Sequence, residues 1–266
     1  GLPVIAVLHG QNTNRAYLSA GSQSDRFRKA LSAVDRLVIV GEPMRAYAGL
    51  LAGRGDHLAV IGNGVDAPER MRVPPDPDTA PVELITVANL QEGKGIDLLI
   101  AALARLAADG AGDWRLRVVG DGPLRDALQA QAARAGLDAR IRLLGARSNA
   151  QVFALLAEAD VFVLPSFREA FGVAYLEAMS TGLLTIGVQG EGPSQFIDHG
   201  RTGFLVAPRS VDSLVATLRP VLTGPRDGWR RIAAAGAAHA RTHCTWQTHA
   251  EQLTDLMDRV IEGPPG

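Results

Sequence analysis

Several features that mark particular kinds of protein are scarce or missing in this chain. It has a single cysteine, Cys244, which excludes an internal disulfide framework and a cysteine-only metal site and leads us to expect a cytoplasmic location. No apolar run approaches the roughly 18 residues needed to span a bilayer. The formal net charge of −1 gives no electrostatic reason to expect nucleic acid as a partner. Lysine is also rare, at Lys29 and Lys94 only, so a lysine in a loop is noteworthy.

What the chain does contain is a regular alternation of short apolar runs and helical patterns. This alternation predicts parallel α/β units, with strands that helices cover on both faces. Strands are expected at 4–8, 36–40, 58–61, 83–88, 115–119, 141–144, 161–164, 184–187 and 203–206. Helices are expected at 24–33, 43–52, 96–109, 123–135, 149–157, 171–180, 211–222, 226–242 and 246–261.

A proline-rich stretch divides the chain into two blocks of unequal size. Five prolines between Pro68 and Pro81 indicate a linker. We predict a partial Rossmann-like domain at 1–66, a linker at 67–81, a complete Rossmann-like domain at 82–245 and a C-terminal helix at 246–266 that crosses back to the first domain. Three strands are too few for a sheet of the usual size, so residues 1–66 are interpreted as the back half of a domain.

Two acids near the middle of the chain are the most informative residues. Glu169 follows the apolar run Val161–Leu164, and Glu177 lies about two turns into the next helical pattern. In open α/β sheets ligands bind at the carboxyl ends of the strands. Carboxylates there can accept hydrogen bonds from hydroxyl groups, and charged acceptors make the stronger bonds. Taken singly, each glutamate is better explained as a solvated surface acid, and it is their shared position at the strand ends that favours a binding role.

Three glycine-containing loops also follow predicted strands. Asn89 and Lys94 lie in the first, and backbone N–H groups at the following helix start, together with the lysine, favour an anion. Gly120 and Gly122 lie in the second, where glycine permits close approach of a ligand. Gly192 lies in the third and could present an N–H donor. Each loop alone could be an ordinary turn, but all three are expected at the same edge of the sheet.

Other candidate motifs carry less weight. His239, His243 and His249 lie near Cys244, but their spacing does not form a compact zinc set, so no metal site is predicted. Asp76-Pro77-Asp78 matches a short acidic motif of some metal-dependent sugar transferases, yet it falls in the linker. His9 follows the first predicted strand, where a lone histidine is more often structural than functional.

Together these residues resemble the retaining, two-domain GT-B glycosyltransferases of the family 4 or "group 1" class. The similarity runs from His9-Gly10, through Lys94-Gly95 and the Glu169/Glu177 segment, to Thr245-Trp246. The resemblance implies an α/β, GT-B-like fold with a donor-binding domain at 82–245 and a partial, acceptor-side domain at 1–66. It implies transfer of a hexose from a nucleotide-diphosphate sugar, without a metal or other cofactor, to a glycan, lipid-linked or small-molecule acceptor.

The resemblance also implies roles for single residues. Glu177 would hold the ribose hydroxyls of the donor, and Glu169 would bind the donor sugar. Lys94 would neutralise the diphosphate, and His9 would contact the transferred sugar. Residues near Leu144–Arg147 would border the base. The remaining donor-binding positions would be Asn89, Gly120, Gly122, Phe171, Gly172 and Gly192.

The chain departs from the family pattern in several places. Asn89 stands where an arginine is usual, and a similar asparagine in relatives that build surface polysaccharides favours that role here. Leu183 and Gln195 replace a usual proline and glutamate. Family members carry about another hundred residues before the His9 strand, and peripheral membrane contact would involve that part. Two alternatives therefore stay open: a nucleotide-sugar-binding module inactive without a separate N-terminal half, and a GT-B-fold nucleotide-sugar epimerase.

Overall fold

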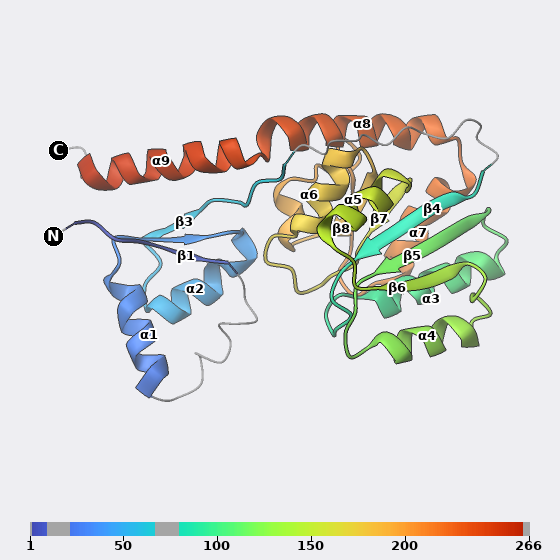
Figure 1. Cartoon of the computed structure of the whole chain (residues 1–266), viewed down its shortest axis with the longest axis horizontal. Helices are drawn as coiled ribbons and strands as arrows, with labels where there is room; N and C mark the ends of the chain where they lie inside the picture. The colour runs from blue at the N-terminus through green and yellow to red at the C-terminus, as the bar shows by residue number, and fades with distance from the viewer. Residues whose placement is uncertain (1, 10–21, 67–79, 263–266) are drawn as a thin grey trace. The chain divides into compact units, whose positions relative to one another are not determined.

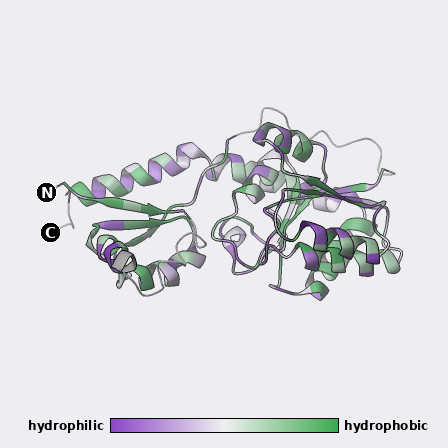
Figure 2. Cartoon of the chain, turned by 60° about the horizontal axis from the view of Figure 1, so that its bottom comes forward, coloured by the Kyte–Doolittle hydropathy of each residue, from purple (hydrophilic) through white to green (hydrophobic). Residues whose placement is uncertain are grey.

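The computed structural model describes residues 2–9, 22–66 and 80–262, and the chain divides into two compact units. One unit comprises Gly1–Gly64 with Cys244–Gly266, and the other comprises Val65–His243. Both are α/β with parallel strands, and the strands are mainly hydrophobic (Figures 1 and 2). This architecture confirms the predicted α/β fold class.

The smaller unit is a three-stranded parallel sheet with the order β1-β2-β3. Its elements are β1 Ile5–Leu8, α1 Ser22–Ala33, β2 Arg36–Ile39, the 3-10 helix η2 Glu42–Met44, α2 Arg45–Ala52, β3 Leu58–Val60 and α9 Trp246–Glu262. Helix α9 joins this unit because Leu256 packs in a cluster with Val38 and Ile61. The ring of His249 also bonds the carbonyl of Gly62 at 2.7 Å, just after the third strand.

The larger unit is a six-stranded parallel sheet with the order β6-β5-β4-β7-β8-β9. Its strands are β4 Val82–Val87, β5 Trp114–Val119, β6 Ile141–Gly145, β7 Val161–Val163, β8 Leu184–Val188 and β9 Phe204–Val206. Its helices are α3 Ile96–Ala108, α4 Arg125–Arg134, α5 Asn149–Ala157, α6 Val173–Thr181, η3 Gly192–Gln195, α7 Val211–Thr223 and α8 Arg226–His243. Helices α3 and α4 cover one face, and α5 and α6 cover the other (Figure 1).

The strand order places one reversal point in the larger sheet. From β4 the chain proceeds outward through β5 to β6, then returns to pair β7 beside β4 and continues to β9. The crevice at such a reversal, beyond the carboxyl ends of the two central strands, is where open α/β sheets bind ligands. In this protein the loops after β4 and β7 border it.

Helix α6 begins two residues later than the sequence pattern predicts. Gly172 has a φ of 93°, in the left-handed region, so the chain turns there and the helix begins at Val173. A Cβ atom at Gly172 would lie 2.5 Å from the ring of Tyr175. Phe171 is therefore a loop residue, buried against Phe196 with ring centroids 5.5 Å apart.

Candidate functional site

Lys94 and Glu169 meet at the reversal point of the larger sheet. Lys94 Nζ lies 2.8 Å from Glu169 Oε2, and the two side chains are only 19% and 15% exposed. One residue follows β4 and the other follows β7, and these strands are neighbours. Because the pair is partly shielded from water, its attraction is stronger than that of a surface ion pair.

The loops after β4 and β7 are packed backbone to backbone, which fixes this pair. Phe167 N and Ser166 Oγ both donate to the carbonyl of Gly93, at 2.9 and 3.2 Å. Gly95 has a φ of 68°, and a Cβ atom there would lie 2.2 Å from the carbonyl oxygen of Pro165. Only glycine allows this approach, so the sequence Gly93-Lys94-Gly95 holds the lysine against the second loop.

Glu177 lies on α6, the helix that follows the Glu169 loop. Its side chain is partly buried, and burial raises the pKa of the Glu177 carboxyl above its ordinary value. Within the described part of the chain, no hydrogen bond or ion pair reaches this carboxylate. Desolvation of an unpaired carboxylate is unfavourable, so the group is suited to accept hydrogen bonds from a ligand.

Tyr175 connects the helix of Glu177 to the start of the Glu169 loop. Its hydroxyl donates to the carbonyl of Leu164 at 2.6 Å, and its ring packs edge-on against Phe162. Burial, with a smaller contribution from the charge of Glu169, raises the pKa of Tyr175 well above its usual range. The residue therefore acts as a neutral hydrogen-bond donor that fixes α6 on the sheet.

The remaining predicted residues of this edge are placed as follows. Asn89 is exposed in the β4 loop. The N–H groups of three glycines donate hydrogen bonds within the chain: Gly120 to the carbonyl of Gly145 at 2.9 Å, Gly122 to the exposed side chain of Asp121 at 2.8 Å, and Gly192 to the carbonyl of Glu169 at 2.9 Å. Contacts of these three N–H groups with a ligand stay predictions.

His9 lies in the smaller unit, exposed at the carboxyl end of β1, so its contact with a transferred sugar also stays a prediction. The segment Leu144–Arg147 ends β6 and turns into the capped helix α5. Asp76-Pro77-Asp78 falls outside the described residues. In the part of the chain that the structure describes, no group of three or more histidine, cysteine, aspartate or glutamate side chains is placed to hold a metal ion.

Sequence reasoning missed Glu191, which is part of this site. Its Oε2 accepts a hydrogen bond from the backbone N–H of Glu169 at 2.8 Å. Burial raises the pKa of Glu191 above its ordinary value, although the hydrogen bond from the Glu169 backbone lowers it. The charge of Glu169 raises this pKa further, and the charge of Lys94 lowers it. An acid between Gly190 and Gly192, directly after a predicted strand, was the available signal.

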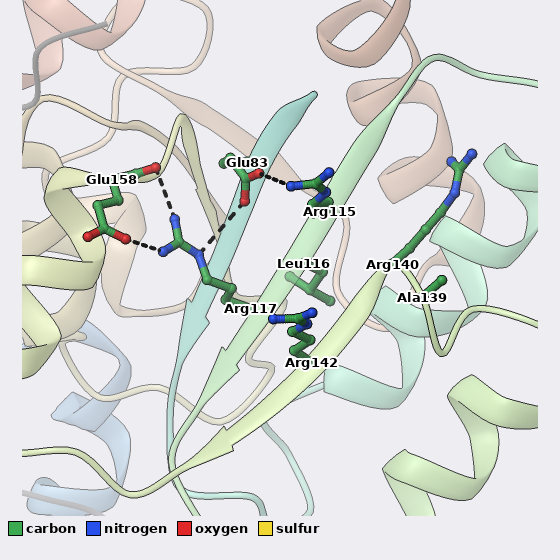
Figure 3. Close-up of a pocket in the computed structure, with 8 residues that line it drawn as sticks. All are labelled: Glu83, Arg115, Leu116, Arg117, Ala139, Arg140, Arg142 and Glu158. Atoms are coloured by element: carbon green, nitrogen blue, oxygen red, sulfur yellow. Dashed lines mark hydrogen bonds and ion pairs between the residues drawn. The ribbon is translucent and has the colours of Figure 1, made fainter. Parts of the chain in front are cut away.

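A separate cavity of about 520 Å³ lies elsewhere on the larger sheet (Figure 3). Arg115, Arg117 and Arg142 line it from β5 and β6, near the amino-terminal halves of these strands. Both of its acids are engaged: Glu83 pairs with two arginines at 3.8 Å, and Glu158 pairs with Arg117 at 2.8 Å. The cavity therefore lies toward the edge opposite Lys94 and offers no acid free to hold hydroxyl groups.

Comparison with known proteins identifies the family. The family described as "Glycosyl transferases group 1" matches residues 69–238, well over half of the chain. The chain belongs to this glycosyltransferase family, as its motifs predicted.

Individual relatives agree with this assignment. The chain is 33% identical over 260 residues to a glycogen synthase of Mycobacterium tuberculosis, which covers 94% of this chain and 61% of the relative. It is 32% identical to a putative colanic acid biosynthesis glycosyltransferase, WcaL, of Salmonella typhimurium, over 80% of this chain and 55% of the relative. The chain thus spans a little over half of the length of these relatives.

Solved structures show the same fold. HepE of Anabaena, in a complex with UDP and glucose, superimposes with a TM-score of 0.78 at 21% identity, over 95% of this chain and 71% of HepE. A sucrose-phosphate synthase of Thermosynechococcus elongatus gives a TM-score of 0.76 at 20% identity, over 97% of this chain and 68% of that one. The fold is therefore that of GT-B glycosyltransferases.

Among the residues that the structure describes, none of the helices has the length and apolar character that a membrane span requires.

Proposed function

We propose that this chain carries the donor site of a retaining, family 4 hexosyltransferase that uses a nucleotide-diphosphate sugar. The observation that carries the proposal is the Lys94–Glu169 pair, 2.8 Å apart at the reversal point of the sheet, where α/β sheets bind ligands. The cation suits a diphosphate, and the carboxylate suits sugar hydroxyl groups.

Each acid has a separate part in this proposal. Glu169 accepts hydrogen bonds from the donor sugar, and Glu177, whose carboxylate is desolvated, accepts them from the ribose. Donor binding would give the unpaired carboxylate of Glu177 a hydrogen-bond partner. A hydroxyl partner stabilises a desolvated carboxylate more than it stabilises one that water already solvates.

Lys94 supplies the charge stabilisation for the leaving group. As the bond between sugar and diphosphate breaks, negative charge grows on the diphosphate, and an ammonium group already in place stabilises it. The proposed transfer requires no resident metal ion or other cofactor, because a protein cation takes that part. The contact of His9 with the transferred sugar belongs to the same proposal.

Relatives support nucleotide sugars as donors but differ in their substrates. One relative, 28% identical, is a GDP-mannose-dependent mannosyltransferase of Mycobacterium tuberculosis, whereas HepE is solved with UDP-glucose. The donor base and sugar are therefore left open. Relatives in colanic acid and amylovoran biosynthesis favour a glycan or lipid-linked acceptor in surface polysaccharide synthesis.

Calorimetric titration of the chain with UDP, GDP and ADP tests the donor site. We expect one nucleotide to bind and Glu177→Ala to weaken its binding about ten- to hundredfold, since a hydrogen bond to a charged group is worth about 1.5–3 kcal/mol. Equal binding by wild type and Glu177→Ala would contradict the ribose assignment. The exposed Glu158 offers a matched control, Glu158→Ala, outside the site.

Product analysis with the bound donor and an acceptor panel separates the alternatives. Transfer with retained anomeric configuration, unchanged by EDTA, supports the metal-independent transferase. An isomerised nucleotide sugar would indicate an epimerase. Donor binding without any product would indicate a module that needs another chain for turnover.

A further inference from the structure

The backbone of Glu169 is held on both sides by the loop that follows β8. Glu191 Oε2 accepts the N–H of Glu169 at 2.8 Å, and the N–H of Gly192 donates to the carbonyl of Glu169 at 2.9 Å. Two consecutive residues of one loop thus bond both polar backbone groups of the acid that pairs with Lys94. A hydrogen bond to a charged acceptor is stronger than one between neutral groups.

The β8 loop is itself firmly attached to the sheet. Ser194 Oγ accepts from Gly190 N at 2.8 Å and lies 3.2 Å from the carbonyl of Val188, the last residue of β8. A Cβ atom at Gly192 would lie 2.3 Å from the carbonyl oxygen of Phe171, so the two loops are in direct backbone contact. Glu191 is therefore a fixed acceptor, partly buried and close to both Lys94 and Glu169.

We propose that Glu191 is a positioning residue: its carboxylate fixes the backbone of Glu169 and so directs the Glu169 side chain at the donor sugar. This inference rests on the proposed function, because it assumes that Glu169 contacts the sugar. Glu191 itself contacts the loop, not the sugar. Its removal should therefore reduce the contribution of the sugar to binding and leave the contribution of the nucleotide unchanged.

The test measures by calorimetry the binding of a nucleotide diphosphate and of its sugar conjugate. Three pairs are tried on the wild type: UDP with UDP-glucose, GDP with GDP-mannose, and ADP with ADP-glucose. The pair that binds best is then used for the variants. For Glu191→Ala we expect about tenfold weaker binding of the conjugate, with the bare nucleotide within about twofold of wild type. Glu191→Gln should restore most of the loss, since its amide oxygen can accept the same N–H. The control is Gln189→Ala, an exposed residue of the same loop.

A second readout does not depend on nucleotide binding. Hydrogen exchange of the Glu169 amide should be at least tenfold faster in Glu191→Ala than in wild type, and intermediate in Glu191→Gln. Unchanged exchange would overturn the positioning role, as would equal weakening of nucleotide and conjugate by Glu191→Ala. A wild-type chain that binds none of the three nucleotides would overturn the proposed function, and with it the effect on sugar binding. The two failures are therefore distinguishable.

Discussion

The pair of Lys94 and Glu169 can be tested by a double-mutant cycle on the stability of the larger unit. The variants are Lys94→Met, Glu169→Gln and the double variant, each of which keeps a side chain of similar length. With charge centres about 4 Å apart and an effective dielectric constant of about 20, the attraction is about 4 kcal/mol before desolvation. Both side chains keep some exposure, 19% and 15%, so solvation and screening offset part of it. We expect a coupling energy of about 1–2 kcal/mol.

Urea unfolding followed by tryptophan fluorescence measures this coupling. Trp114 and Trp229 are buried in the larger unit and report its transition, whereas Trp246 is exposed in the smaller one. Each single variant should lower the free energy of unfolding, and the sum of the two losses should exceed the loss measured for the double variant. A coupling energy below about 0.3 kcal/mol, which is the usual error of additivity, would refute the pairing of these two charges.

Three further predictions concern single residues. Burial raises the pKa of Glu177, so folding favours the protonated form of this carboxyl. Its contribution to stability is complete below pH 4.5 and is lost as the pH rises through the raised pKa of the folded state. Glu177→Gln should therefore stabilise the chain in urea at pH 8 and have little effect at pH 4. Gly95→Ala should lower the free energy of unfolding in urea by about 2–5 kcal/mol, because the added Cβ meets the carbonyl of Pro165. The control Gly110→Ala has nearly the same φ but no neighbour within 4 Å, and should lower it by only about 1–2 kcal/mol. Equal losses would contradict the close contact with Pro165. Burial raises the pKa of Cys244 to about 11, so iodoacetamide at pH 8 should modify it roughly a hundredfold more slowly than an ordinary thiol, and an equal rate would contradict its burial.

The sequence was sufficient for the order and type of the elements. Runs such as Leu116–Val119 are apolar and β-branched, so their strands are recognisable, and the turn residues between them mark the ends. Helix α5 was predicted at its observed bounds, Asn149–Ala157, and in the structure Ser148 and Gln151 form a capping box at its start. The start of α6 was predicted two residues too early, because the left-handed turn at Gly172 depends on the packing of Tyr175.

The candidate site was predictable only in part. Strand ends and glycine loops placed Lys94 and Glu169 at one edge, since carboxyl ends of parallel strands share an edge. The adjacency of these two loops depends on the strand order, which brings β4 beside β7 although 73 residues lie between Val87 and Val161. Hydrophobic periodicity carries no information on strand order. The hydrogen bond from Glu169 to Glu191 is a matter of loop geometry, and no pattern of residue types specifies it.

The mutual bracing of the strand-end loops bears on how substrate preference could diverge among relatives. Gly120 and Gly192 donate their N–H groups to backbone carbonyls of neighbouring loops, so these parts of the rim keep their shape independently of the exposed side chains that the rim carries. Asn89 and Arg147 project from this rim into solvent. Single substitutions at such positions can retune selectivity while the scaffold stays constant, which is how one architecture could come to serve donors with different bases and sugars.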